Sequence, residues 1–369
     1  MRGFSLRGTA GRRGACLAVA AFLASACGGD VAGPASSFDP QATARSVAQV
    51  QAAGNNPALI QLNLAGRALA QATGASPSIV PRLVRSSLFG DIAVYRSLVT
   101  GKASIPIFPH NLLGKTFVYD PATGDYVVDE TLSGAPANGV RFLLYRLDPE
   151  TEQPALPLEV TGFLDIMDQS GAASTRLAIR AVDTTGGAET TLLDYFLDGF
   201  FTVSGTELSV SFSSAGFISD GSTRVEFDLQ QTLSATDGVS TVHASVAHRI
   251  TIPTSGISLD LALEGDIAGA PTDEIRFTFT VNDGDNVAVL AVTASQTSLD
   301  GSLAYNGEEV VQIGGSPDAP SFTRTDGAPL SEGDIQALQD IFGAVDGVLN
   351  FADDLFGPLA ELFGIDQSS

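Results

Sequence analysis

The stretch Ile275-Arg276-Phe277-Thr278-Phe279-Thr280-Val281-Asn282-Asp283-Gly284-Asp285-Asn286-Val287 alternates apolar and polar side chains and then reaches a turn. Alternation with a period of two is typical of a β-strand with one apolar and one polar face. The turn contains Asp283-Gly284, and Gly is favoured in tight turns because it adopts positive φ at no steric cost. The stretch therefore predicts a hairpin, with residues 287–292 as its second strand.

The same pattern recurs from Lys115 to about Ile313. It predicts ten or more strands, covering residues 117–119, 126–128, 140–147, 158–167, 177–182, 192–201, 208–212, 225–229, 242–252, 257–263, 275–281 and 287–292, with the last turns at Asp300-Gly301 and Asn306-Gly307. Short turns favour an antiparallel meander over a parallel or βαβ arrangement. Residues 115–315 are thus expected to form one antiparallel β domain, either a half-barrel or an open curved sheet.

Helices are predicted on both sides of this β domain. Residues 39–114 form an N-terminal helical region: Pro40 opens a first helix that runs to about Ala53, and a second follows Asn55-Asn56-Pro57 and ends at Gly74. The apolar stripes of residues 76–98 are expected to cover the sheet. Residues 316–369 supply a Pro/Gly-rich linker over 316–329 and then an amphipathic helix. Ser331-Glu332-Gly333-Asp334 resembles a capping box, which marks the start of that helix. The predicted fold class is α+β, with helices packed on the apolar face of the sheet.

The N-terminus has the pattern of an export signal. Its basic region contains Arg2, Arg7, Arg12 and Arg13, and an apolar run follows that ends in Ala24-Ser25-Ala26. The apolar run has about a dozen residues, whereas a permanent transmembrane helix needs ~20. Residues 1–26 are therefore predicted to be a removed signal peptide.

This segment resembles the lipobox of bacterial lipoproteins, in which the residue after the cut is a lipidated cysteine, here Cys27. The resemblance implies acyl chains, palmitate among them, on Cys27 and a cell-envelope location. Gly28 would favour the outer membrane where one exists. Residues 27–38 are small and Gly/Pro/Ser-rich, as expected of a tether between lipid and domain. The alternative is an ordinary A-x-A cleavage site, which would give a soluble secreted protein.

Charge and composition exclude several classes of function. Removing residues 1–26 takes the formal net charge from −23 to −27. Nucleic-acid binding needs a positive surface, and anionic lipids would repel this body, so membrane attachment would depend on the acyl chains. The two cysteines are Cys16, in the signal, and Cys27, so no thiolate metal site is expected. No catalytic or cofactor motif is present, and we expect no enzyme, no cofactor and no metal site.

Three histidines and several acidic turns are candidate sites. His243 and His248 are five apart in a strand, so they point to opposite faces and cannot bind one metal together. His110 follows Pro109 in a Pro-rich link, and each histidine is expected to be structural or at the surface. The acidic turns at Asp120, Asp220 and Asp283 could bind calcium, but Asp and Gly are also what turns require.

Two hypotheses for function follow. By order of elements alone, the chain is similar to the helix-covered half-barrels of bacterial lipoprotein carriers and lipid-binding lipoproteins. That resemblance implies an apolar ligand, such as an acyl chain, between sheet and helices. The alternative is a non-catalytic surface scaffold or adhesion protein. Such a protein could also bind divalent cations at the acidic face of its sheet. The sequence leaves the oligomeric state open.

Overall fold

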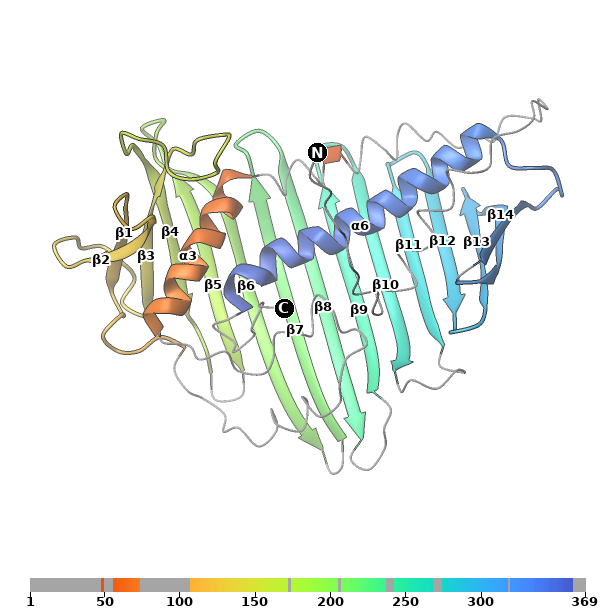
Figure 1. Ribbon diagram of the computed structural model, residues 1–369, viewed down its shortest axis with the longest axis horizontal. Helices are drawn as coiled ribbons and strands as arrows, with labels where there is room; N and C mark the ends of the chain where they lie inside the picture. The colour runs from red at the N-terminus through yellow and green to blue at the C-terminus, as the bar shows by residue number, and fades with distance from the viewer. Residues whose placement is uncertain are drawn as a thin grey trace, which may run out of the picture.

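The protein is built around one large open sheet, crossed on one face by two helices (Figure 1). A computed structural model describes residues 48–49, 56–73, 107–171, 174–204, 207–236, 242–267, 274–317 and 319–360. The predicted signal peptide, the tether with Cys27, and the stripes of 76–98 lie outside the described residues. Most of the first predicted helix also lies outside the described residues. Its described part, Ala48 and Gln49, is helical.

Within the described residues the sheet has 15 strands, and its linear order leaves both edge strands without a further neighbour. The strands are β1 (Lys115–Asp120), β2 (Asp125–Asp129), β3 (Gly139–Tyr145), β4 (Val160–Asp168), β5 (Thr175–Asp183), β6 (Thr190–Ser204), β7 (Glu207–Ser219), β8 (Arg224–Thr236), β9 (Val242–Ile252), β10 (Ile257–Ile267), β11 (Ile275–Asn282), β12 (Val287–Ala294), β13 (Leu299–Tyr305), β14 (Glu308–Ser316) and β15 (Ala319–Arg324). From β3 to β15 each strand pairs with the next in the chain. The sheet is thus open at β15 and β2.

The predicted antiparallel meander is confirmed except at one end, where β1 and β3 pair in parallel. The β1–β2 hairpin forms as expected, with Asp120 opposite Asp125. The chain then returns past the hairpin and adds β3 to the other side of β1, so β3 runs in the same direction as β1. Short turns predict antiparallel neighbours only for strands that they join directly, and β1 and β3 are not joined directly.

Two predictions near the end of the sheet are corrected: a turn at Asp300-Gly301 and a linker at residues 316–329. Asp300-Gly301 lies inside β13, and the turn before this strand is at residues 295–298, where the Ser295 N–H donates to the Ser298 carbonyl (2.8 Å). Gly301 is needed for another reason: a Cβ there would lie 2.3 Å from the Ala291 carbonyl oxygen on the neighbouring strand. The predicted linker at 316–329 contains β15, whose Pro320 is tolerated because the strand is at an edge.

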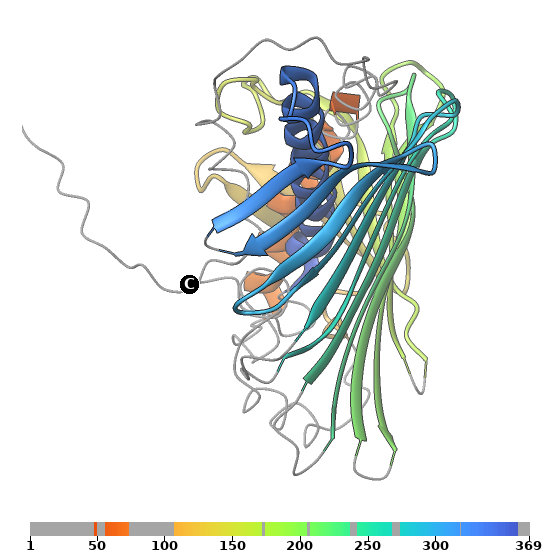
Figure 2. The same cartoon turned by 90° about the vertical axis from the view of Figure 1, so that its right-hand side faces the viewer.

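Alternation along the strands gives the sheet two different faces. We call the face that carries the helices the helix-bearing face, and the opposite one the outer face (Figure 2). In β8, Val225, Phe227 and Leu229 are buried, whereas the intervening Glu226 and Asp228 are not. The apolar core lies between the helix-bearing face and the two helices.

The first of these helices, α3 (Pro57–Thr73), begins as the sequence predicts. Asn56 is its N-cap, because the Asn56 Oδ1 accepts a hydrogen bond from the Ala58 N–H (2.8 Å), and Pro57 occupies the first helical position. The Asn56 side-chain amide also donates to the Ser219 carbonyl at the end of β7 (2.8 Å). Farther along, Gln61 Oε1 accepts from the Tyr145 N–H of β3 (2.7 Å). These bonds hold α3 in register with the sheet.

The second helix, α6 (Glu332–Ala360), has 29 residues and is about 43 Å long. The predicted capping box forms: the Asp334 N–H donates to Ser331 Oγ (3.2 Å), and the Ser331 N–H donates to the Asp334 carboxylate (2.9 Å). Arg324, the last residue of β15, also bonds the Asp334 carboxylate (3.0 Å). Burial opposes ionisation of Asp334, but the bonds from Ser331 and Arg324 outweigh it and lower its pKa. This network joins the edge strand to the start of α6.

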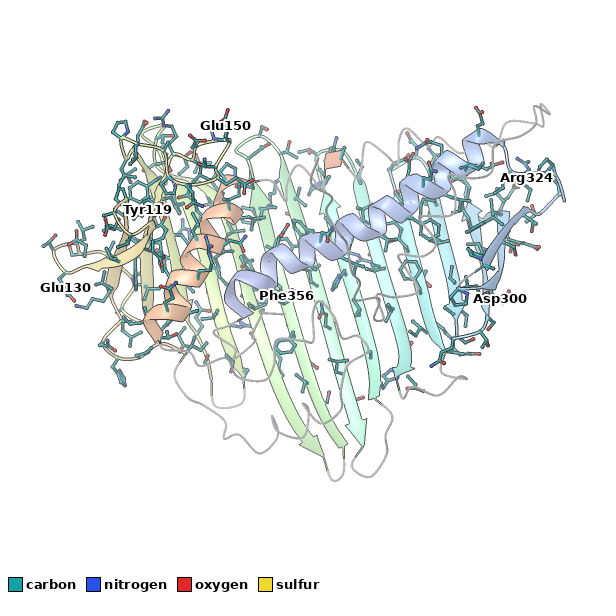
Figure 3. All side chains as sticks on the ribbon, viewed as in Figure 1. Tyr119, Glu130, Glu150, Asp300, Arg324 and Phe356 are labelled. Carbon is teal, nitrogen blue, oxygen red and sulfur yellow. The ribbon has the colours of Figure 1, made fainter. Side chains whose placement is uncertain are left out.

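One side of α6 is buried along its length. Buried residues recur at helical spacing at Leu338, Ile341, Ala344, Val345, Val348, Phe351, Ala352, Leu355 and Phe356. Two contacts fix the helix against the sheet: the Tyr195 hydroxyl donates to the Leu355 carbonyl (3.0 Å), and the rings of Phe227 and Phe351 meet edge to face at 5.5 Å. Figure 3 shows Arg324 near the start of the helix and Phe356 near its end. None of the helices in the described ranges is long and apolar enough to cross a membrane.

Candidate functional site

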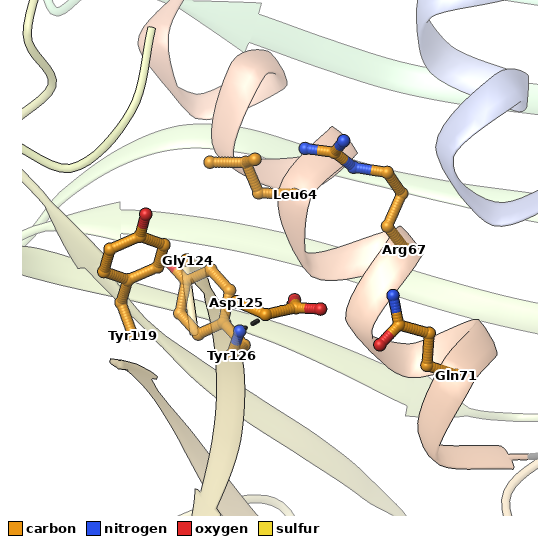
Figure 4. Close-up of a pocket in the computed structure, with 7 residues that line it drawn as sticks. All are labelled: Leu64, Arg67, Gln71, Tyr119, Gly124, Asp125 and Tyr126. Carbon is orange, nitrogen blue, oxygen red and sulfur yellow. Dashed lines mark hydrogen bonds between the residues drawn. The ribbon is translucent and has the colours of Figure 1, made fainter. Parts of the chain in front are cut away.

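The candidate site is a cavity between α3 and the β1–β2 hairpin (Figure 4). Its volume is about 80 Å³. Leu64, Arg67 and Gln71 line one side from α3, where spacings of three and four residues place them on one face of the helix. The hairpin lines the other side with Tyr119 and with Gly124-Asp125-Tyr126. Because both elements pack in the core, their backbones hold the two sides of the cavity opposite each other.

The hairpin turn sets the position of Asp125. Four residues connect the paired Asp120 and Asp125, and the Asp120 carbonyl accepts the N–H of Gly124 (2.8 Å). Gly124 has φ of +73°, a left-handed conformation that favours glycine. Asp125 follows directly, and its Oδ1 accepts the Tyr126 N–H (2.8 Å). Its carboxylate points toward α3 (Figure 4).

Opposite charges face this cavity without meeting. Arg67 and Gln71 are exposed on α3, and Asp125 is partly exposed on the hairpin. No ion pair joins Arg67 to Asp125, and within the described part of the chain Arg67 has no carboxylate partner. By contrast, Lys115 on the same hairpin is paired with Glu130. The guanidinium and the carboxylate therefore keep unused hydrogen-bonding capacity.

Tyrosine rings form the floor of the site. Tyr119, Tyr126 and Tyr145 cluster with ring centroids 5.8 to 6.4 Å apart. The Tyr126 hydroxyl donates to the Leu143 carbonyl (2.8 Å). Burial, with smaller contributions from Tyr145 and Tyr119, raises the pKa of Tyr126 far above its usual value, and burial also raises the pKa of Tyr145. Tyr126 and Tyr145 therefore stay neutral, and of the clustered rings those of Tyr119 and Tyr126 line the cavity.

This cavity was not predicted from the sequence. The sequence predicted both of its elements, the helix after Pro57 and the hairpin at 120–125, but not that they meet. A weak signal existed, because Tyr119 and Tyr126 flank the turn in apolar positions and Arg67 is the one charged residue of α3. Helix and hairpin are about 50 residues apart in the chain, so no local pattern links them.

The histidines lie as the strand period predicts. His243 is on the outer face, with Nδ1 3.0 Å from Asp266 and Nε2 3.5 Å from Glu264. His248 faces the core with 2% exposure, and its Nε2 lies 3.3 Å from the Gln231 amide nitrogen. Burial lowers the pKa of His248 to about 4, so this side chain is neutral at pH 7. His110 is exposed in a turn.

The acidic turns use their carboxylates internally. Asp283 Oδ1 accepts the N–H groups of Asp285 and Asn286, and Asp220 Oδ1 accepts those of Ser222 and Thr223. Hydrogen bonds from Thr223 and Ser222 lower the pKa of Asp220. Within the described ranges, no three His, Cys, Asp or Glu side chains lie close enough together to hold one metal ion.

The outer face has rows of arginine, carboxylate and phenylalanine. Arg141 makes two 2.7 Å bonds to Asp165 and lies 3.8 Å from the ring centroid of Phe163. Arg176 bonds Asp198 at 2.6 and 2.7 Å and lies over Phe196 at 4.6 Å. In both cases the arginine and the aspartate lie directly opposite each other on neighbouring strands, so the ion pairs stabilise the register of the sheet.

The function of this chain must be inferred from its own residues, because no protein-family model, no curated protein and no solved structure was found to match it.

Proposed function

We propose that this chain is a lipid-anchored cell-envelope protein, attached through acyl chains on Cys27, and that its body is a non-catalytic scaffold. The anchor is supported by the basic, apolar and small-residue pattern before Cys27. A chain with three acyl groups would stay attached, because more than one acyl chain is needed for stable membrane residence. The excess of acidic residues supports attachment by the acyl chains over attachment by charge.

The observation that supports a scaffold best is the contact of α6 with the sheet. Leu338, Val348, Phe351 and Leu355 are each no more than 2% exposed, and the Phe227 and Phe351 rings touch. We propose that the helices cover the sheet as a permanent part of the core. Where α6 is in direct contact with the strands, an acyl chain would have to displace it.

An apolar ligand between helix and sheet, the first hypothesis from the sequence, is less well supported. Pockets for small organic ligands usually have volumes of about 300–1,000 Å³ and mostly apolar walls. The cavity beside α3 measures about 80 Å³ and is lined by Arg67, Gln71 and Asp125 among others. We therefore rank the scaffold above the lipid carrier.

Two measurements test this proposal. For the anchor, cells are labelled with palmitate: we expect label on the wild-type protein and none on Cys27→Ser. Unlabelled wild type would contradict the anchor and leave the A-x-A secretion alternative.

For the body, the protein is purified from whole cells and their medium, and its bound lipids are measured by mass spectrometry. The Cys27→Ser protein serves as a control without the anchor. We expect no stoichiometric lipid in the body of either protein. One lipid bound per molecule of the Cys27→Ser protein would contradict the scaffold and support the carrier.

A further inference from the structure

We infer that the cavity between α3 and the β1–β2 hairpin binds a small zwitterion with a carboxylate and an ammonium group, of the size of glycine or alanine. This inference does not depend on the lipid anchor or on the scaffold proposal. It rests on the two opposite charges that face the cavity without forming an ion pair, and on the size and walls of the cavity.

The charges exclude the simpler ligand classes. Arg67 offers a planar fork of donors that suits a carboxylate. A simple anion would also face Asp125 and be repelled, and a simple cation would face Arg67 and be repelled. A lining with one carboxylate and one guanidinium is likewise a poor site for a divalent metal, which takes several oxygen ligands. A molecule with both charges can satisfy Arg67 and Asp125 together.

The remaining side chains suit the same ligand. Gln71 carries both a donor and an acceptor, so its amide can bond either end of a zwitterion. Tyr119 and Tyr126 add aromatic rings to the wall, and such rings attract an ammonium group placed over their faces. Tyr126 is held in place by its bond to the Leu143 carbonyl.

Size selects a small ligand. The cavity volume of about 80 Å³ is well below the roughly 300–1,000 Å³ of pockets that take drug-sized ligands, so it favours a ligand of only a few non-hydrogen atoms. Glycine and alanine match this size better than an amino acid with an aromatic side chain does.

The test is a titration of the full mature protein, followed by NMR through the Arg67 Nε–H and Gln71 side-chain amide signals. The probes are glycine, alanine, acetate, methylamine and phenylalanine. We expect saturable shifts with glycine and alanine, and at least tenfold weaker binding of acetate, methylamine and phenylalanine. Acetate binding as tightly as glycine would overturn the inference, and so would the absence of a saturable shift with glycine and alanine.

Variants then test the two charged residues. Arg67→Gln and Asp125→Asn should each weaken glycine binding about tenfold or more, because each removes one charge-assisted contact. Asn at position 125 keeps the oxygen that accepts the Tyr126 N–H, so the turn should be retained. Arg249→Gln, which removes a charge from the distant outer face, is the matched control and should bind like wild type. Unchanged glycine binding in Asp125→Asn, with an unchanged melting temperature, would contradict the inference.

Discussion

The two faces of the sheet use the same strands in different ways. On β8, Phe227 and Leu229 point into the core and are 4% and 0% exposed, whereas Glu226 and Asp228 between them face outward. The inward face contacts α6 through rings and aliphatic chains, and the outer face forms ion pairs between neighbouring strands. Burial of apolar area therefore stabilises one face, and directional charged contacts stabilise the other.

This difference predicts unequal costs of substitution. Removing a large core side chain costs both its transfer free energy and the cavity that it leaves. Exposed ion pairs contribute about 0–1 kcal/mol, because water and salt screen them. Substitutions on the helix-bearing face should thus destabilise the protein several times more than those on the outer face.

The largest effect is expected at the contact of α6 with β8. Phe351→Ala should lower the free energy of unfolding by about 3–5 kcal/mol, because it removes a ring that is 2% exposed and touches Phe227. Urea denaturation of the wild type and the variant measures this loss in the free energy of unfolding. The matched control is Asn350→Ala, an exposed neighbour on the same helix, with an expected change within about 0.5 kcal/mol. Equal losses in the two variants would mean that α6 does not form part of the core.

A pH-dependent effect is expected next, at His248. Its pKa is about 4 in the fold against an ordinary value of 6.5, so the unfolded chain binds the proton first. Its contribution to stability is present above pH 6.5 and is lost as the pH falls toward 4, by about 3 kcal/mol in total.

Urea denaturation between pH 7 and 5, above the range where most carboxylates titrate, measures the effect of His248. The wild type should lose stability more steeply than His248→Leu as the pH falls. Parallel pH profiles for the two proteins would show that His248 is not buried as described.

A smaller effect is expected at Arg176–Asp198 on the outer face, whose carboxylate is more buried than that of Arg141–Asp165. Arg176→Ala should cost about 2 kcal/mol, because the Asp198 carboxylate is 3% exposed and would lose two charge-assisted bonds. Arg176→Lys keeps the charge without the two-pronged geometry, so an intermediate loss is expected in the same denaturation experiment. A loss as large as that of Phe351→Ala would remove the distinction between the two faces.

The smallest effect is expected at Arg249, which is paired with Asp260 across β9 and β10. Its side chain is 68% exposed, so Arg249→Ala should cost less than about 1 kcal/mol. The loss should shrink further in 1 M salt, where screening is strong. Thermal unfolding at low and high salt checks this, and a loss that grew with salt would contradict an exposed ion pair.

Local patterns predicted many of the elements. The hairpin read from residues 275–292 forms as β11 and β12, because strand period and turn residues act within a few positions. The start of α3 at Asn56-Pro57 and the capping box of α6 at Ser331 and Asp334 were predicted for the same reason. The errors at Gly301 and β15 have a common cause. Gly and Pro suggest turns and linkers, whereas here Gly301 allows close approach of a neighbouring strand and Pro320 lies on an edge strand.

The sequence by itself determined the elements with one apolar and one polar side, the excess of acidic residues and the export pattern that predicts lipidation of Cys27. Only the tertiary structure decided the parallel pairing of β1 with β3, the contact of Phe351 with Phe227 where α6 crosses the sheet, the burial of His248 and the cavity between Arg67 and Asp125. The physical reason is the distance along the chain over which each interaction acts. Strand periodicity, helix capping and turn formation depend on residues that are near neighbours in the sequence. Each of the other features depends on segments that are distant in the sequence and meet only when the whole sheet has formed.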